Sequence, residues 1–121
     1  MSRKLPSILH EESIRQGLKS INSLGQPNWS LRIVDELGPP SHVLEVHYKL
    51  KNFKKTWEFL NLIAKQSDLK KHHPTIITTY NKIDIELTTH DVGNNITDED
   101  LNLAESIHKE YYNLISQKPN Q

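Results

Sequence analysis

Three histidines are the residues of this sequence best suited to proton-transfer chemistry. His72 and His73 are adjacent and precede Pro74, and His90 follows a short way along the chain. Imidazole titrates near neutral pH, so it can both give and take a proton under physiological conditions. Proline favours an extended residue before it, which predicts a junction between a helix ending near Asp68 and a strand. If that strand and the strand ending at His90 form a hairpin, the three imidazoles meet at one edge of a sheet, as an acid–base site requires.

The same histidines allow two simpler interpretations. A polar loop without a chemical role would also tolerate a histidine pair. A metal site is the second alternative, but adjacent residues of an extended segment point to opposite faces, so His72 and His73 are poorly placed to share one ion. The chain has no cysteine and no HExxH helix motif. The spacing therefore favours a site that works without a metal, and we expect neither a metal nor another cofactor.

A longer pattern around these histidines carries a family resemblance. It reads Asp68-x3-His72-His73-Pro74-x5-Tyr80-x9-His90, with Asp100 further on. This pattern resembles the signature of the pterin-4a-carbinolamine dehydratases. The similarity extends over residues 8 to 115 and includes the segments Tyr80-Asn81-Lys82-Ile83, Leu87-Thr88-Thr89-His90 and Asp100-Leu101-Asn102-Leu103-Ala104.

The resemblance implies a hydro-lyase acting on a pterin. Such an enzyme removes water from a 4a-hydroxytetrahydropterin and forms the quinonoid dihydropterin, as in the recycling of tetrahydrobiopterin. One acid must protonate the departing hydroxyl and one base must take a proton from a ring nitrogen, so two imidazoles of opposite protonation state can perform the reaction. Carried over by motif position, His72 and His90 form the acid–base pair, and His73 completes the catalytic set by orienting the pterin.

The resemblance also assigns binding and supporting roles near the histidines. Asp68 or Asp100 would hold a histidine in one tautomer. For Asp100, a purely structural role as a negative charge at the start of the last helix is equally compatible. Besides the three histidines, the residues expected to contact the pterin ring are Lys71, Thr88, Thr89 and Asp91.

The composition fits a single domain spanning residues 1–121, with a modest core because only 35% of the residues are hydrophobic. Lys and Arg together number 15, as do Asp and Glu, so we expect no general affinity for nucleic acid or membranes. No apolar run approaches the roughly 20 residues of a membrane span. We expect an intracellular protein of the cytoplasm or the mitochondrial matrix, because Arg3 and Lys4 faintly resemble a presequence.

Hydrophobic periodicity predicts the order helix, strand, strand, helix, strand, strand, helix. Thr97 and Asp100 have the spacing of a capping box at the start of the last helix. This order predicts an α+β two-layer sandwich, in which three helices cover one face of a four-stranded antiparallel sheet. The resemblance implies the same fold. The expected bounds are helices at 10–23 and 53–67, strands at 29–36, 43–50, 75–80 and 83–89, and a last helix starting after residue 97.

Two side-chain patterns make more specific predictions. In the strand at 83–89, Ile83, Ile85 and Leu87 alternate as the inward face, so His90 falls on the outward face. In the helix at 53–67, five residues at helical spacing form a stripe that we expect to be buried. They are Phe53, Trp57, Leu60, Ile63 and Ala64.

The sequence is also compatible with two other functions. Some members of the family act as dimerisation cofactors of homeodomain transcription factors, so the chain could be a protein-binding module. A dehydratase-like protein of other pterin or molybdopterin metabolism would use the same site.

The strand at 43–50 is regular and lacks proline, and we expect it to be an exposed edge that pairs with a second copy. The family resemblance likewise favours a homodimer or homotetramer.

Overall fold

The order of helices and strands in a computed structural model of the chain is the predicted one. The structure describes residues 5–35 and 38–116, so Arg3, Lys4 and the expected end of a strand at Glu36 lie outside the described residues. The elements are α1 (Glu11–Asn22), β1 (Ser30–Val34), β2 (Ser41–Lys49), α2 (Phe53–Lys70), β3 (Thr75–Thr79), β4 (Lys82–Leu87), the short 3-10 helix η1 (His90–Val92) and α3 (Asp98–Ile115).

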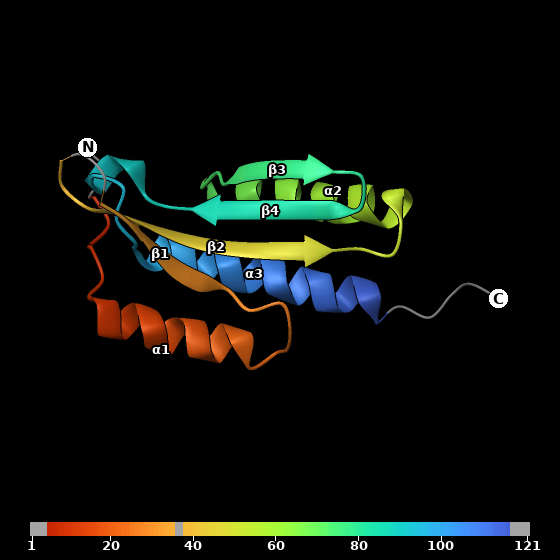
Figure 1. The fold of residues 1–121 in the computed structure, drawn as a ribbon, viewed down its shortest axis with the longest axis horizontal. Coiled ribbons are helices and arrows are strands. Elements are labelled where there is room, and N and C mark those ends of the chain that lie inside the picture. The colour runs from red at the N-terminus through yellow and green to blue at the C-terminus, as the bar shows by residue number, and fades with distance from the viewer. Residues whose placement is uncertain (1–4, 36–37, 117–121) are drawn as a thin grey trace.

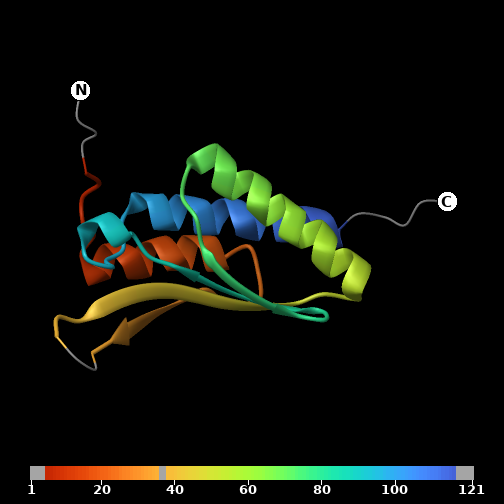
Figure 2. The same ribbon diagram turned by 90° about the horizontal axis from the view of Figure 1, so that it is seen from above.

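The four strands form one antiparallel sheet in the order β1-β2-β4-β3. All three α-helices lie on one face of this sheet and leave the other face open (Figure 1, Figure 2). The inward side chains of β4 are buried at Ile83, Ile85 and Leu87, as their alternation predicts. The α+β two-layer sandwich is therefore confirmed. Within the described residues, no helix combines the length and the apolar character that crossing a membrane requires.

The predicted edge strand lies in the interior of the sheet. β2 pairs with β1 through residues 41–45 and with β4 through residues 44–49, so it is not an edge strand of the sheet. The exposed edges are β1 and β3. The prediction that the strand at 43–50 is an exposed edge is therefore wrong, and its pairing with a second copy loses that support. Alternation of side chains identifies a strand, but it does not show which strands flank it.

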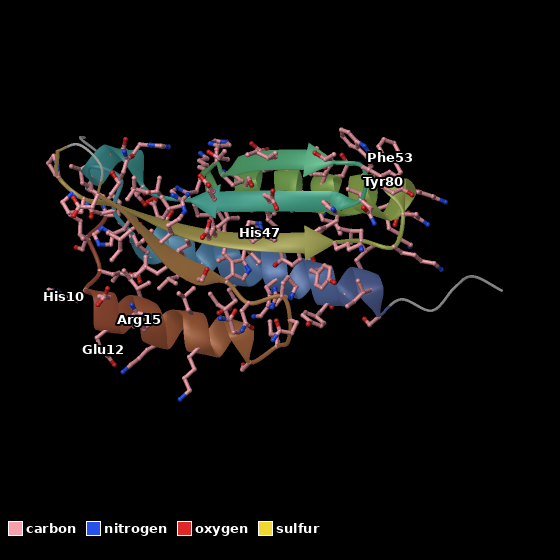
Figure 3. The ribbon with its side chains drawn as sticks, viewed as in Figure 1. His10, Glu12, Arg15, His47, Phe53 and Tyr80 are labelled. Carbon is pink, nitrogen blue, oxygen red and sulfur yellow. The ribbon has the colours of Figure 1, made fainter. Side chains whose placement is uncertain are left out.

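The predicted buried stripe of α2 is also partly wrong, because the helix buries a neighbouring face. Phe53 and Trp57 remain 54% and 47% exposed, and Ala64 is exposed as well. The Phe53 ring instead lies parallel to the ring of exposed Tyr80, with 6.5 Å between centroids (Figure 3). The buried residues of α2 are Thr56, Phe59, Leu60, Ile63 and Ser67. Two neighbouring faces of this helix both contain Leu60 and Ile63, and only the packing against α3 and the sheet decides between them.

A buried chain of hydrogen bonds connects α3 to the sheet and to the loop after α1. Trp29 Nε1–H donates to the hydroxyl of Tyr48 at 3.0 Å, and that hydroxyl lies 2.7 Å from Nδ1 of His108. His108 Nε2 lies 2.8 Å from the carbonyl oxygen of Gly25. Every group is satisfied when Tyr48 donates to Nδ1 and Nε2–H donates to Gly25, which requires a neutral imidazole. Burial lowers the pKa of His108, in agreement with this neutral form.

Candidate active site

The end of α2 gives the two adjacent histidines different exposure. Lys71 adopts a left-handed backbone with φ of 52°, which ends the helix. The His72 N–H then donates to the carbonyl of Ser67 at 3.1 Å, so the chain folds back over the last turn. His72 is buried with 9% exposure, whereas His73 is exposed. The two adjacent imidazoles therefore differ in their access to solvent.

The β3–β4 hairpin brings the third histidine to the same place. Thr75 at the start of β3 pairs with Glu86 near the end of β4, so the chain before β3 lies beside the chain after β4. After β4 the backbone enters η1, which begins at His90. The loop then reverses through Gly93 and Asn94, which both have positive φ, as their composition predicts. His90 is exposed, in agreement with the predicted outward face.

These segments enclose a cavity of about 150 Å³, which we call the histidine pocket. All three histidines line it, so the hairpin brings them together at the end of the sheet. The other residues that were predicted to contact a pterin line it too. Its full lining consists of Lys71, His72, His73, Thr88, Thr89, His90, Asp91 and Glu99.

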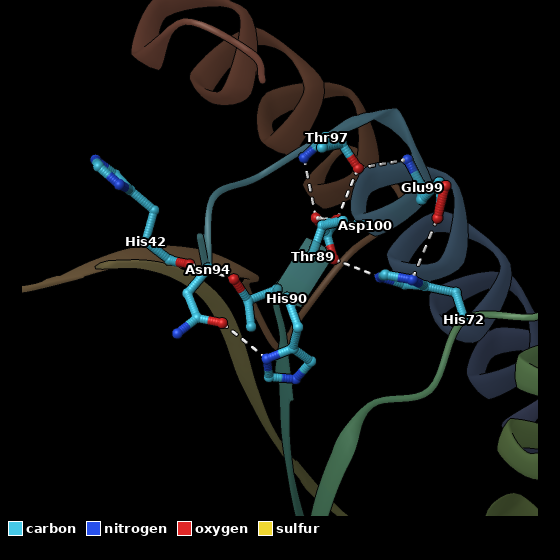
Figure 4. A network of polar contacts seen from close by, with 9 residues as sticks. His42, His72, Thr89, His90, Asn94, Thr97, Glu99 and Asp100 are labelled. Atoms are coloured by element: carbon cyan, nitrogen blue, oxygen red, sulfur yellow. Dashed lines mark hydrogen bonds and ion pairs between the residues drawn. The ribbon is translucent and has the colours of Figure 1, made fainter. Parts of the chain in front are cut away.

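Asp100 holds His72 from the buried side of the pocket. Its Oδ1 lies 2.6 Å from His72 Nε2, and the residue itself is fully buried (Figure 4). Its Oδ2 accepts the Thr97 N–H at 2.9 Å and the Thr89 hydroxyl at 2.7 Å. The predicted capping box is therefore confirmed. The two roles considered for Asp100 are combined, because one oxygen contacts the histidine and the other caps α3.

His72 lies between two carboxylates. On its other side, Nδ1 is 3.5 Å from Oε1 of Glu99, which also lines the pocket (Figure 4). A doubly protonated ring has an N–H to offer on each side and carries the charge that two carboxylates attract. When both nitrogens of His72 carry a proton, the ring can donate an N–H to a carboxylate on each side, and this form can act as an acid.

His90 has a different environment. Its Nδ1 lies 2.7 Å from the amide oxygen of Asn94, an acceptor that requires a proton on Nδ1 (Figure 4). No hydrogen bond of Nε2 occurs in the described part of the chain. In the neutral ring the Nε2 lone pair is thus available, which is the arrangement of a base. The two imidazoles of the pocket therefore have different neighbours, carboxylates at His72 and an amide oxygen at His90.

One predicted supporting residue does not reach the site, and two residues were missed. The Asp68 side chain is exposed and does not line the histidine pocket, and its backbone carbonyl accepts the Lys71 N–H. Asp68 therefore belongs to the last turn of α2, and its side chain is not placed to fix a histidine tautomer in the histidine pocket. Glu99 and Asn94 were missed because their sequence contexts, the first turn of a helix and a polar loop, are common in any protein. Across residues 5–35 and 38–116, no three His, Asp or Glu side chains are grouped to hold a metal ion.

Comparisons with known proteins point to one family. The family model described as pterin 4 alpha carbinolamine dehydratase matches residues 7–110. A protein of the archaeon Sulfurisphaera tokodaii, provisionally named a pterin-4-alpha-carbinolamine dehydratase, is 35% identical over 99 residues. The match covers 82% of this chain and 91% of that protein.

Two solved structures share the fold. One is a transcriptional coactivator/pterin dehydratase from Brucella melitensis, with a TM-score of 0.69 and 22% identity, covering 85% of this chain and 97% of the other. The other is a pterin dehydratase-like protein identified as a RuBisCO assembly factor in the alpha-carboxysome, with a TM-score of 0.52 and 20% identity. It covers 74% of this chain and 93% of the other. At these identities the likeness concerns the fold.

Proposed function

Because the chain belongs to the pterin 4 alpha carbinolamine dehydratase family, we propose that it removes water from a 4a-hydroxytetrahydropterin. The product is the quinonoid dihydropterin, and the reaction serves the recycling of tetrahydrobiopterin. One observation supports this most directly. His72 and His90 line one pocket, but carboxylates flank the first, whereas an amide oxygen holds the second.

The proposed reaction uses both imidazoles in one step. His72 gives the proton on Nδ1 to the hydroxyl on carbon 4a, and the carbon–oxygen bond breaks to release water. His90 Nε2 takes the proton from the ring nitrogen next to that carbon. The electron pair of the N–H bond becomes the new carbon–nitrogen double bond, so no oxidant or reductant is needed. Each proton transfer is expected to contribute on the order of 10²-fold to the rate.

The other lining residues are proposed to hold the pterin ring. His73 is exposed, unlike His72, and would orient the ring from the open side of the pocket. Lys71 and Asp91 offer charges at the rim, and Thr88 and Thr89 form the wall between the histidines. Asp100 does not line the pocket, so it acts on the substrate only by positioning His72.

A protein-binding module is the second candidate function. Exposed Phe53, Trp57 and Tyr80 form an aromatic cluster away from the histidine pocket, with Phe53 in ring contact with both others. The names of the two structural relatives, a transcriptional coactivator and a RuBisCO assembly factor, also favour protein contacts. A dehydratase-like role with another pterin would use the histidine pocket and leave this cluster without a function.

We also propose a homodimer or homotetramer, with β3 in place of β2 as the contacting edge. β3 is an edge strand, and all five of its residues are exposed, including Ile76 and Ile77. It contains neither a proline nor a charged residue that would protect an edge. A second copy would pair its free backbone groups. The proposal includes no direct contact with nucleic acid.

A dehydration assay on the purified protein tests the function. Synthetic 4a-hydroxytetrahydropterin is mixed with enzyme, and formation of the quinonoid product is followed by its absorbance. We expect the rate to rise in proportion to enzyme concentration above the uncatalysed rate. A rate equal to that of buffer at all enzyme concentrations would contradict the dehydratase and leave the protein-binding module as the better account.

A further inference from the structure

The proposed dehydration leaves the two imidazoles of the histidine pocket in exchanged proton states after each turnover. His72 has given the proton on Nδ1 to the departing hydroxyl, and His90 has taken one from the ring nitrogen. Before the next substrate reacts, His90 must lose a proton and His72 must regain one. His90 is exposed, so it can release its proton directly to water. His72 is only 9% exposed and needs a route by which a proton returns.

The two carboxylates beside the His72 ring differ in their access to solvent. Asp100, 2.6 Å from Nε2, is fully buried, and its Oδ2 accepts hydrogen bonds from Thr97 and Thr89. A proton from water reaches this carboxylate only if the start of α3 opens. Glu99 lies 3.5 Å from Nδ1, and 27% of its side chain is exposed. Because Glu99 also lines the histidine pocket, it connects water with the nitrogen that has lost its proton.

The first turn of α3 holds Glu99 on the side of His72 that donates the proton. The Glu99 backbone N–H donates to the Thr97 hydroxyl at 3.2 Å, which fixes the main chain, whereas the side chain can still rotate. The distance of 3.5 Å from Oε1 to Nδ1 is longer than an ordinary hydrogen bond between nitrogen and oxygen (Figure 4). A substrate hydroxyl can therefore approach Nδ1 during the reaction, and the carboxylate can approach Nδ1 once water has left.

We propose that Glu99 is a proton relay that returns His72 to its reactive form after each turnover. The inference rests on the proposed function, because it assumes that His72 Nδ1 gives up a proton. Glu99 takes a proton from water or a dissolved buffer acid and becomes a neutral carboxyl group. Its O–H bond then breaks as an N–H bond forms at His72 Nδ1, which restores the carboxylate. His90 releases one proton to water, so the cycle is balanced and needs no oxidant or reductant.

Stopped-flow dehydration by Glu99→Gln tests the relay, because glutamine keeps the shape of the side chain but cannot pass on a proton. The first turnover uses the proton that His72 already holds. We therefore expect a burst of about one product per site, followed by turnovers about tenfold slower than those of the wild type in dilute buffer. The wild type should show no such burst, because its relay restores His72 quickly.

Small buffer acids should restore the later turnovers of Glu99→Gln, because they can enter the histidine pocket and protonate His72 directly. We expect kcat to rise with imidazole concentration, at constant pH and ionic strength, to within about threefold of the wild type. A merely structural role of Glu99 would not give this dependence. Asp98→Asn is the matched control, since it removes an exposed carboxylate of the same helical turn outside the histidine pocket, and its kcat should not depend on buffer.

Nitrogen NMR of His72 measures the same proton transfer without substrate. Line widths at the midpoint of each variant's titration give the rate at which Nδ1 gains and loses its proton. In dilute buffer, we expect this rate to be about tenfold lower in Glu99→Gln than in the wild type or Asp98→Asn.

The outcomes separate the relay from the proposed function. A Glu99→Gln variant with the kcat of the wild type, or with a lowered kcat that buffer does not raise, would overturn the relay even if the protein is a dehydratase. Equal exchange rates at His72 in the variant and the wild type would overturn it as well. Slower exchange in the variant, together with no turnover by the wild type, would support the proton route through Glu99 and contradict the proposed reaction instead.

Discussion

Asp100 Oδ1 lies 2.6 Å from His72 Nε2, although the two residues are 28 positions apart in the chain. This contact joins the segment after α2 to the first turn of α3. The other oxygen of the carboxylate binds Thr97 N–H and the Thr89 hydroxyl, so the same residue caps the helix and orients the proposed acid. The start of α3 and the geometry of the histidine pocket therefore depend on one buried charge.

The first prediction concerns this shared carboxylate. Asp100→Asn keeps the shape but places an amide NH₂ where an oxygen accepts hydrogen bonds. We expect a loss of about 1–3 kcal/mol in the free energy of unfolding, because a buried polar group loses its partner. We expect kcat to fall about tenfold or more, because His72 loses the carboxylate that positions it. Asp98→Asn, which changes an exposed acid of the same helical turn, is the control.

The second prediction concerns the residue that orients His90. Asn94 has a φ of 59°, a conformation that glycine adopts without strain, so Asn94→Gly removes the amide and preserves the backbone. We expect kcat to fall about 3- to 10-fold, as for the loss of one orienting hydrogen bond. Thermal unfolding should change little, because Asn94 is only partly buried. Unchanged kcat in this variant would mean that the amide does not position the base.

The third prediction follows from the lowered pKa of buried His108. Because its folded-state pKa lies below the ordinary value of about 6.5, the unfolded chain binds the extra proton more readily. The contribution of His108 to stability is thus complete above pH 6.5 and decreases as the pH falls towards the folded-state pKa. Urea unfolding measures the free energy of unfolding at each pH. This free energy should fall more from pH 8 to pH 5 in the wild type than in His108→Gln. Equal losses would contradict a neutral His108 in the Tyr48 hydrogen bond.

The fold could be predicted from the sequence because its local signals agree. The alternation of buried side chains predicts a strand at Ile83, Ile85 and Leu87. The capping box predicts the start of a helix at Thr97. The position of β2 could not be predicted, because its pairing with β4 joins residues far apart in the chain and leaves no local signal. The buried face of α2 was misjudged for a related reason. Aromatic Phe53 and Trp57 appeared to mark the core, but that position depends on how the helix packs on α3.

The site was predictable to the extent that the family motif contains it. The seven residues expected around the pterin all line one cavity, because the β3–β4 hairpin that the motif spans sets their spacing. Residues outside the motif were not found. Glu99 and Asn94 reach the histidines only after the loop and the first turn of α3 have folded, and their residue types are frequent in such positions.

The fourth prediction concerns assembly through β3. Light scattering of the wild type at micromolar concentration should give at least twice the 14.1 kDa mass of one chain. Ile77→Lys places a charge on the exposed edge strand and should shift the protein towards the monomer. Ile115→Lys makes the same change at an exposed position of α3 and should leave the mass unchanged. A wild type that is monomeric throughout this range would rule out the proposed assembly.

The measurement that tests the central claim most directly is the dehydration rate of His72→Ala and His90→Ala beside the wild type. The account predicts that each substitution lowers kcat on the order of 10²-fold or more, because each removes one proton transfer. Circular dichroism should show that both variants keep the fold. His47→Ala, which removes an exposed histidine of β2 paired with Asp84 outside the histidine pocket, should retain full activity (Figure 3). Wild-type turnover by either His72→Ala or His90→Ala would contradict the proposed acid–base pair.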